Sequence, residues 1–281
     1  MESRNFYLGT HQPHWLAFSD FPLFVSRRRL EDYKVLPIAR SNWSQDSGGF
    51  TELSMYGEWT INIREYVKLT RRFRDEIGKM DWAAPMDWMC EPFILEMTKK
   101  NVLTHQRRTV LNYVALMEMA PDVPWIPVLQ GWHPSDYLRC IDLYARYRVD
   151  LTKLPVVGVG SICRRQGEVR IAMLLEQLAG CGLKLHGFGI KLKGLELAAN
   201  SLYSADSMAW SYTARRLPTQ CGSKTHKNCA NCYEFAEDWR DRVATLIERT
   251  RLAGSPLREV QADIFSSEET GSVLPGLSEA L

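Results

Sequence analysis

Three aspartates in this chain are candidates for catalytic chemistry. Asp46 opens the run Asp46-Ser47-Gly48-Gly49-Phe50, in which an acid and a hydroxyl precede two glycines and an aromatic residue. Asp87 and Asp206 each follow a largely apolar stretch further along the chain. A pair of carboxylates can exchange a glycosidic bond when one attacks the anomeric carbon and the other moves a proton on and off the leaving group. The same aspartates could instead cap strand ends, a use that requires no catalysis.

The glycine-rich run suits a flat, polar heterocycle such as a purine. Glycines let the main chain turn tightly and approach a ligand closely. Phe50 could stack on a planar ring, while Gln130 and Asp87 could bond its polar edge. Backbone groups around Gly158 and Gly160 could reach an exocyclic oxygen or amine. A glycine-rich turn without any ligand is the competing interpretation.

A group of metal-binding residue types lies near the C-terminus. Cys221, His226, Cys229 and Cys232 fall within residues 221–232. Their spacing suits one tetrahedral zinc ion, and four protein ligands would leave no open position, so we expect a structural zinc. Free cysteines in a loop are the alternative. The total of seven cysteines and the lack of a recognisable secretory signal favour metal binding over disulfides.

Secondary structure has to bring these residues together. Apolar stretches predict eight strands, at 6–10, 22–26, 35–40, 82–86, 125–129, 155–157, 184–189 and 201–205. Segments with helical spacing follow most of them, at 61–77, 102–119, 137–147, 168–179, 192–199 and 233–252. Repeated strand–helix alternation predicts an α/β fold with a parallel sheet. Eight units in a chain of this length predict a closed (β/α)8 TIM-like barrel with an inserted zinc-binding loop.

Polar residues and glycines follow the predicted strands at their C-terminal ends. They are Asp46, Asp87, Gln130, Gly158, Gly187 and Asp206. Barrels of this class carry their active sites at that end, so we expect these residues to share one pocket. We expect a single domain over 1–255, which includes the loop 221–232, and a partly disordered extension over 256–281.

Overall composition leaves the substrate open. The chain has 281 residues, of which 45% are hydrophobic and 24% charged, as is usual for a globular protein. A formal net charge of +2 does not indicate a nucleic-acid binder. Clustered arginines could still form a phosphate-binding rim if they gather beside the pocket: Arg27, Arg28, Arg29, Arg164, Arg165, Arg215 and Arg216. No apolar run is long enough to span a membrane, and we expect a cytoplasmic protein.

The order of these motifs resembles the tRNA-guanine transglycosylase superfamily over about residues 5 to 250. The run from Asp46 to Phe50 is its most specific part, and it is followed in order by Gln130-Gly131, Gly158-Val159-Gly160, Gly187-Phe188-Gly189, and Asp206 with the Cys/His loop. The DNA deazaguanine transglycosylases of the DpdA family are the branch that the chain resembles more closely. That likeness rests on residues 7–13, residues 24–28, Thr51 after Phe50, and a compact loop with His226 before two cysteines.

This resemblance implies a role for each candidate residue. Asp206 would be the nucleophile at C1′ of a deoxyguanosine, and Asp46 the general acid and base. Phe50 would stack on the base. Guanine and its 7-deaza replacement would be recognised by Asp87, Gln130, Gly131 and the backbone of Gly158, Val159 and Gly160.

The implied reaction exchanges guanine in DNA for a 7-deazaguanine, most simply the 7-cyano form, preQ0. The target nucleotide would have to be flipped out of the duplex. Zinc would be the only cofactor, and DNA and the free base the partners, with a helper protein and a homodimer as further possibilities. Three alternatives stay open: a tRNA-guanine transglycosylase, a non-catalytic zinc protein that binds nucleic acid, and a barrel glycosidase acting on sugars.

Overall fold

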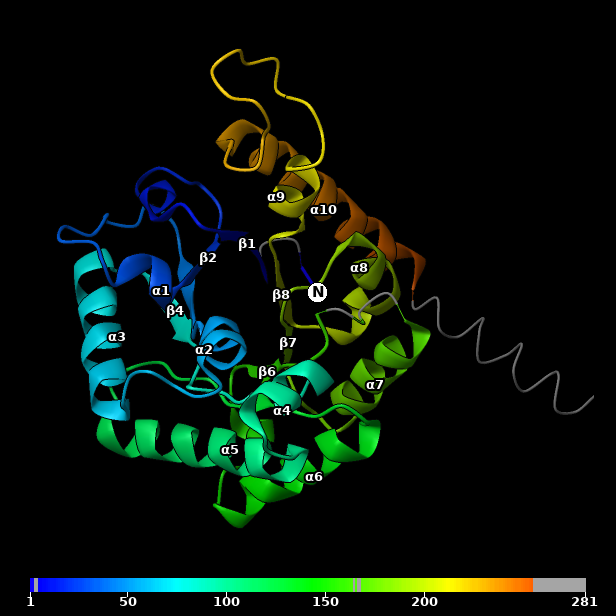
Figure 1. Ribbon diagram of the computed structural model, residues 1–281. Coiled ribbons are helices and arrows are strands. Elements are labelled where there is room, and N and C mark those ends of the chain that lie inside the picture. The colour runs from blue at the N-terminus through cyan, green and yellow to red at the C-terminus, as the bar shows by residue number, and fades with distance from the viewer. Residues whose placement is uncertain (3–4, 164, 166–167, 255–281) are drawn as a thin grey trace, which may run out of the picture.

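The computed structural model describes residues 1–2, 5–163, 165 and 168–254. In this part of the chain, parallel strands form one curled sheet that helices surround (Figure 1). The strands are β1 (Phe6–Thr10), β2 (Leu23–Ser26), β3 (Trp43–Asp46), β4 (Met80–Ala83), β5 (Val128–Leu129), β6 (Val157–Val159), β7 (Leu185–Gly187) and β8 (Ser204–Ser207). Their order in the sheet is β4-β3-β2-β1-β8-β7-β6-β5. The predicted extension over 256–281 lies outside the described residues.

The two end strands of this order, β4 and β5, almost meet. A single bridge between Ala83 and Trp125 joins their neighbourhoods. Ala83 N–H donates to the Pro124 carbonyl at 3.0 Å, and Ile126 N–H donates to the Ala83 carbonyl at 3.1 Å. Pairing does not continue from this bridge into a ladder between β4 and β5 among the described residues. The predicted closed barrel is therefore confirmed only as an α/β fold with a curled, eight-stranded parallel sheet.

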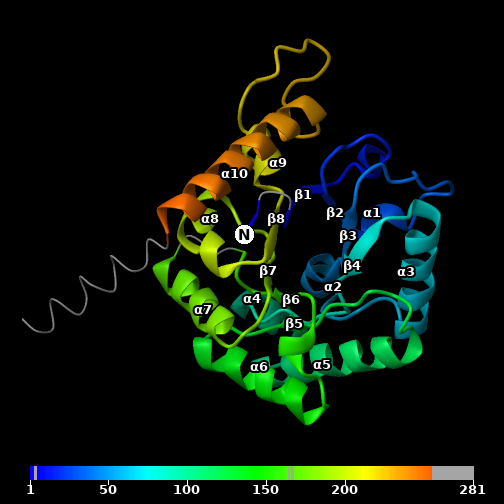
Figure 2. The same ribbon diagram turned by 180° about the vertical axis from the view of Figure 1, so that it is seen from behind.

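One group of helices forms the outer layer. Those are α3 (Ile63–Ile77), α5 (Val102–Met119), α6 (Pro134–Arg146), α7 (Val169–Gly180), α8 (Leu192–Ala198) and α10 (Tyr233–Ala253), and they surround the sheet in both views (Figures 1 and 2). The other helices of the described residues are α1 (Arg27–Leu30), α2 (Gly49–Tyr56), α4 (Pro92–Thr98) and α9 (Ala209–Ala214). Helices α2 and α4 pack against each other. None of the described helices is both long and apolar enough to cross a bilayer.

Local sequence explains where the best-predicted helices begin and end. Asn62 caps α3 by accepting from the Glu65 N–H at 3.0 Å, and the Glu65 side chain returns a bond to the Asn62 backbone. Such a capping box satisfies amides that the first helical turn leaves unpaired. Tyr66 and Phe73 of the same helix are buried in the main hydrophobic core. The helix ends at Gly78, whose φ of 73° favours glycine.

One predicted strand is wrong. The apolar run at 35–40 is irregular, and Val35 and Ile38 are 84% and 78% exposed. The third strand is instead β3, whose buried Trp43 donates from its indole N–H to the Gly78 carbonyl at 2.7 Å. Buried Gln45 donates to Thr70 Oγ1 at 2.9 Å. Hydrogen bonds to α3 and its C-cap thus make a polar sequence into an interior strand. The other predicted strands overlap observed ones.

A separate aromatic cluster fills the inside of the curled sheet. Tyr7, Phe24 and Trp82 are buried there, with Phe188 packed against them. The ring of His186 lies among them, 4.6 Å from the Trp82 ring and 4.7 Å from the Phe188 ring, measured between centroids. Phe24 and Phe188 also line the pocket described next, so this cluster forms its floor.

Candidate active site

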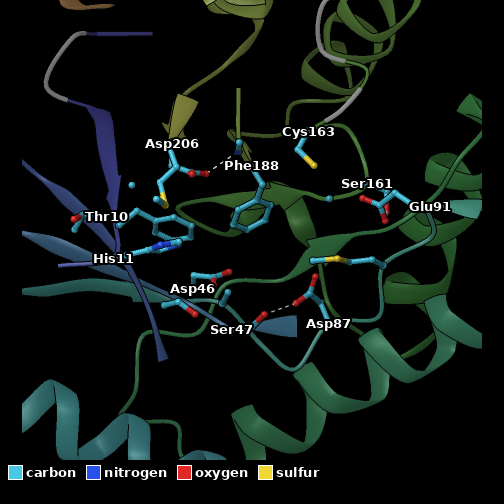
Figure 3. Close-up of a pocket in the computed structure, with 18 residues that line it drawn as sticks. Thr10, His11, Asp46, Ser47, Asp87, Glu91, Ser161, Cys163, Phe188 and Asp206 are labelled. Carbon is cyan, nitrogen blue, oxygen red and sulfur yellow. Dashed lines mark hydrogen bonds between the residues drawn. The ribbon is translucent and has the colours of Figure 1, made fainter. Parts of the chain in front are cut away.

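The three predicted aspartates line one pocket at the C-terminal end of the sheet (Figure 3). Asp46 is the last residue of β3, Asp87 follows β4, and Asp206 lies in β8. The pocket has a volume of about 240 Å³, close to the lower limit of small-molecule sites, which is about 300 Å³. Its other lining residues include His11, Phe24, Glu91, Ser161, Phe188 and Met208. The structure therefore brings together acids that are far apart in the sequence.

The glycine-rich run turns the chain from β3 into α2 and fixes two of the acids. Gly48 has a φ of 78°, in the left-handed region that glycine adopts without strain. Its amide donates to Asp46 Oδ2 at 3.1 Å. Ser47 Oγ accepts from the Gly49 N–H at 3.0 Å and donates to Asp87 Oδ1 at 2.8 Å. The run is thus a turn, and the same turn orients both carboxylates.

Arg27 lies beneath this turn rather than at the pocket rim. Its side chain is 1% exposed and pairs with Glu31 and, at 2.5 Å, with Glu52. Its Nε donates to the Ser47 carbonyl at 3.3 Å. Glu52 is fully buried and also pairs with Arg28 at 2.7 Å. Because its guanidinium is enclosed by carboxylates and a carbonyl, Arg27 is not placed to contact a DNA phosphate as predicted. It holds the turn instead.

Burial makes Asp46 and Asp87 weaker acids than free aspartate. Removal from water raises the pKa of Asp87 to about 7, helped by the charge of Asp46 and opposed by the hydrogen bonds from Ser47 and Gln130. Burial also raises the pKa of Asp46, where the charge of Asp206 adds to the effect and the Ser26 hydroxyl opposes it. A carboxyl group that keeps its proton near pH 7 can act as a general acid.

Asp206 is held differently. Its Oδ1 accepts a hydrogen bond from the Gly189 N–H at 2.9 Å, the interaction drawn as a dashed line in Figure 3. The same oxygen lies 3.4 Å from His186 Nε2, close but not aligned for a hydrogen bond. The other ring nitrogen of His186 is bonded to Ser204 Oγ at 2.9 Å. Asp206 therefore reaches the pocket from β8 with a fixed side-chain orientation.

Gln130 reaches the site through Asp87 and does not itself line the pocket. Its Nε2 donates to Asp87 Oδ2 at 2.7 Å. Gly160 does line the pocket, and a Cβ there would lie 2.3 Å from Gln130 Nε2, so only glycine leaves room for this amide. Gly131 and Val159 lie next to these residues in the chain and do not line the pocket.

The aromatic residue in the pocket is Phe188, which sequence reasoning assigned only to a strand end. A Cβ at Gly158 would lie 2.6 Å from Phe188 Cε2, so this glycine makes space for the ring. Phe50, the predicted stacking residue, lies in α2 with its ring 6.0 Å from the Phe93 ring and does not line the pocket. The signal that could have identified Phe188 is its position between two glycines at the end of a strand.

Two of the predicted DNA-binding arginines lie beside the pocket. Arg29 Nη2 is 3.3 Å from Nδ1 of His11, a lining residue. Burial, and then the charges of Arg29 and Arg215, lower the pKa of His11 to about 4. His11 is therefore neutral at pH 7, and both arginines place positive charge at this edge.

The other predicted arginines that the structure describes have protein partners. Besides the Arg28 pair with Glu52, Arg165 lies over the Trp132 ring at 4.1 Å and Arg216 over the Tyr212 ring at 3.7 Å. Arg164 lies outside the described residues. Of the predicted arginines, Arg29 and Arg215 are therefore the ones that the structure places beside His11.

The four predicted metal ligands come together in the segment between α9 and α10, which stands away from the sheet (Figure 1). One potential ligand atom from each of Cys221, His226, Cys229 and Cys232 lies within 4.8 Å of the others. Cys221 Sγ is 3.3 Å from His226 Nε2 and 3.6 Å from Cys229 Sγ. Zinc bonds of about 2.3 Å to sulfur and 2.0 Å to nitrogen require separations of roughly 3.5–3.8 Å. The cluster therefore fits a closed tetrahedral site.

Comparison with protein families identifies a match over most of the chain. The family described as DpdA, DeoxyPurine in DNA protein A, matches residues 1–272. The chain belongs to the DpdA family. The match includes the β3–α2 turn, the three pocket aspartates and the Cys/His cluster. Membership in DpdA supports a transglycosylase role in deazapurine modification of DNA in general terms. A comparison with curated proteins found no match.

Proposed function

We propose that this DpdA-family protein replaces guanine in DNA with a 7-deazaguanine, most simply preQ0, through a covalent bond between Asp206 and C1′ of the deoxyribose. One observation carries the proposal. Asp46, Asp87 and Asp206 converge on one pocket, and burial raises the pKa values of the first two. This arrangement offers both an attacking carboxylate and a proton donor.

In the first displacement, Asp206 attacks C1′ while the bond from C1′ to guanine breaks. Asp46 gives its proton to the departing guanine, which leaves as the neutral base. The raised pKa of Asp46 supports this assignment, because the side chain keeps its proton closer to neutral pH than an exposed aspartate does. The product is an ester between Asp206 and the deoxyribose.

In the second displacement, N9 of the incoming base attacks C1′ and the ester bond to Asp206 breaks. The N9 proton passes to Asp46, which returns to its starting state. Two inversions at one carbon give retention of configuration. One glycosidic bond replaces another, so the exchange consumes no other reactant.

The base is proposed to lie between Phe188 and Asp87. Phe188 and Phe24 line the pocket with flat apolar surface, and Asp87 can bond the N1–H and 2-amino group of guanine. Both groups are shared by guanine and preQ0, so one site serves the leaving and the entering base. Phe50 stays a predicted stacking residue only if α2 moves when the base binds.

DNA is proposed to approach over His11. Arg29 and Arg215 lie at this edge and can hold phosphates on either side of a flipped nucleotide. A helper protein that opens the duplex and a homodimer stay predictions.

We also propose that the Cys/His cluster holds a structural zinc ion, which when bound would cross-link the chain between α9 and α10. The purified protein should contain about one zinc per chain. Cys229→Ser should lose the metal and expose the segment between α9 and α10 to protease while the sheet stays folded. Loss of zinc without a change in proteolysis of this segment would contradict a structural role.

The test of the main proposal is incorporation of labelled guanine. The protein is incubated with labelled guanine and either double-stranded DNA, single-stranded DNA or tRNA, and label in the polymer is counted. Label should enter DNA, and unlabelled preQ0 should compete with it. Denaturing gels should show a covalent protein–DNA adduct that Asp206→Ala abolishes. Label in tRNA alone would establish the tRNA enzyme instead, and an adduct that persists in Asp206→Ala would exclude this nucleophile.

A further inference from the structure

A chain of buried hydrogen bonds leads away from Asp87 to a second acid, Glu91. Gln130 donates from Nε2 to Asp87 Oδ2 at 2.7 Å. Ser161 Oγ is bonded to Gln130 Oε1 at 2.7 Å and to Glu91 Oε2 at 2.9 Å. All four residues are at most 6% exposed. Asp87, Ser161 and Glu91 lie along one side of the pocket in Figure 3.

Ser161 sets the smallest number of carboxyl protons in this chain of hydrogen bonds. Its hydroxyl oxygen also accepts from the Cys90 N–H at 2.7 Å. A hydroxyl has one proton to donate and two lone pairs that accept. With one lone pair taken by Cys90, one of the two remaining neighbours, Gln130 or Glu91, must donate to Ser161 and the other must accept.

Two arrangements with a single carboxyl proton satisfy every group. In the first, protonated Glu91 donates to Ser161, Ser161 donates to the Gln130 carbonyl, and the Gln130 amide donates to ionised Asp87. In the second, the Gln130 amide is turned over, protonated Asp87 donates to its carbonyl, and Ser161 donates to ionised Glu91. If both acids were ionised, two oxygen atoms would face each other at hydrogen-bond distance without a proton between them.

We propose that Asp87 and Glu91 share one proton through Gln130 and Ser161, so that Glu91 sets whether Asp87 offers the base an acceptor or a donor. Glu91 is thereby a positioning residue for base recognition. The need for at least one proton on this pair of acids follows from the contacts alone. Its consequence for the base rests on the proposed function.

The backbone around Ser161 is consistent with a constrained relay. Ser161 has a φ of 57°, which is rare for a residue with a side chain. Gly160, just before it, leaves the space in which the Gln130 amide lies. Together, these two features hold the Ser161 hydroxyl between the Gln130 amide and the Glu91 carboxyl group.

Other titratable groups surround both ends of the relay. Asp87 faces Asp46 from β3, and its charge also acts on Tyr66 of α3 and Tyr144 of α6. Glu91 acts on Cys90 and Tyr137 and has contacts besides Ser161. Any group that stabilises ionised Glu91 moves the shared proton to Asp87, and any group that stabilises ionised Asp87 moves it to Glu91. A bound guanine edge presents two N–H donors to Asp87. It therefore stabilises ionised Asp87 and moves the shared proton to Glu91.

The test is a titration of the carboxyl carbons of Asp87 and Glu91 by NMR in the full-length protein. Coupled acids titrate as a pair, with two macroscopic steps that both nuclei report. Glu91→Gln can donate or accept at Ser161, so it keeps the hydrogen bonds but removes the shared proton. Asp87 should then lose the step that it shares with Glu91 while its coupling to Asp46 stays, and its midpoint should shift by about one pH unit or more. Ser161→Ala should separate the two titrations as well.

The matched control is Asp81→Asn, which removes a partly buried acid that is bonded to Tyr7 and Asn42 and does not line the pocket. It should leave the Asp87 titration in two steps. A single Asp87 step in the unaltered protein, or a midpoint that Glu91→Gln leaves in place, would overturn the relay even if guanine exchange occurs. Two coupled steps in a protein that exchanges no base would support the relay and refute the proposed function.

The functional readout is base preference. Hypoxanthine lacks the 2-amino group, so it presents one N–H donor fewer to Asp87. In Glu91→Gln, the pH dependence of kcat/KM for guanine should shift in the same direction as the Asp87 midpoint. The ratio of guanine to hypoxanthine incorporation should change with it. A purely structural role for Glu91 would lower both rates equally and leave the pH profile in place.

Discussion

The two walls of the pocket are built on different principles. The β3–β4 wall carries Asp46 and Asp87, and buried charges and side-chain hydrogen bonds hold it from behind. The β7–β8 wall carries Asp206, to which the Gly189 amide is the hydrogen-bond donor among the described residues. Side-chain ion pairs and hydrogen bonds therefore anchor the first wall. In the second wall, Asp206 lies in β8, a strand that is buried throughout, and the chain continues from there through α9 to the Cys/His cluster.

This difference shows how one pocket can hold acids with different chemical roles. A group that carries a proton near neutral pH has to be removed from water, and removal from water requires a dense, well-anchored wall. A group that attacks carbon has to reach the substrate and needs little more than orientation. Substitutions in the β3–β4 wall should therefore alter folding as well as activity. Substitutions of the acid in the β7–β8 wall should alter activity alone.

The largest effect is expected for Asp206→Asn. The amide keeps the size of the side chain but cannot form the ester, so the exchange rate should fall on the order of 10⁴-fold. Labelled-guanine incorporation into DNA measures the rate, and thermal unfolding should show a midpoint close to that of the unaltered protein.

Asp81→Asn is the matched control for Asp206→Asn. Asp81 is a half-buried acid in β4, and burial raises its pKa, yet it does not line the pocket. Its substitution should leave exchange nearly unchanged. A large loss of thermal stability in Asp206→Asn would break the contrast between the walls, because it would show that Asp206 also supports the fold.

The second effect concerns the anchoring of the β3–β4 wall. Arg27→Met should lower the free energy of unfolding by about 3–5 kcal/mol, because it removes one partner of a buried ion pair and leaves Glu52 less well paired. Arg40→Met, at a pair with Asp20 in which the side chains are 59% and 71% exposed, should cost about 0–1 kcal/mol. Denaturant unfolding of both variants measures the difference. Equal losses would show that burial of the Arg27 pair does not stabilise the turn.

Short-range patterns explain what could be predicted from the sequence. The cap at Asn62 and the apolar spacing of α3 are local, and so are the glycines that bend the chain after Asp46. The Cys/His cluster is local as well, and its four ligands do come together. Parallel strands all end on the same side of the sheet, so residues after different strands could be expected to meet there.

What could not be predicted depends on partners distant in the sequence. The apolar run at 35–40 resembles a strand, but nothing packs over Val35 and Ile38. Arg27 reads as part of a basic surface until Glu52, 25 residues later, encloses it. Ser161 and Glu91 are 70 residues apart, and no local pattern links them. Such contacts are a property of the packed fold.

The third effect is a dependence of stability on pH that originates in the β3–β4 wall. Burial raises the pKa of Asp87 to about 7 in the folded protein, against about 3.9 in an unfolded chain. Because the folded pKa is the higher one, the stabilisation is full below about pH 4 and is lost as the pH rises through about 7. The stability of the unaltered protein relative to Asp87→Asn should fall by about 3–4 kcal/mol at most over this range. Denaturant unfolding at several pH values measures it, and a difference that is constant with pH would show that Asp87 is solvated.

The smallest effect is expected at the edge of the pocket, where both walls would meet DNA. Arg29 and Arg215 each lie close enough to His11 to lower its pKa, so a phosphate bound there would be attracted by both charges. Arg29→Ala and Arg215→Ala should each weaken DNA binding uniformly across sequences and reduce the salt slope of binding by about 1. Arg71→Ala, at an exposed ion pair with Asp122 on the outer helix α3, is the control and should change neither. If the salt slope falls for Arg29→Ala alone, DNA is held from α1, the helix that carries Arg29 and precedes β3 in the chain. If it falls for Arg215→Ala alone, the residues after β8 bind the phosphate, and DNA is held from the β7–β8 wall.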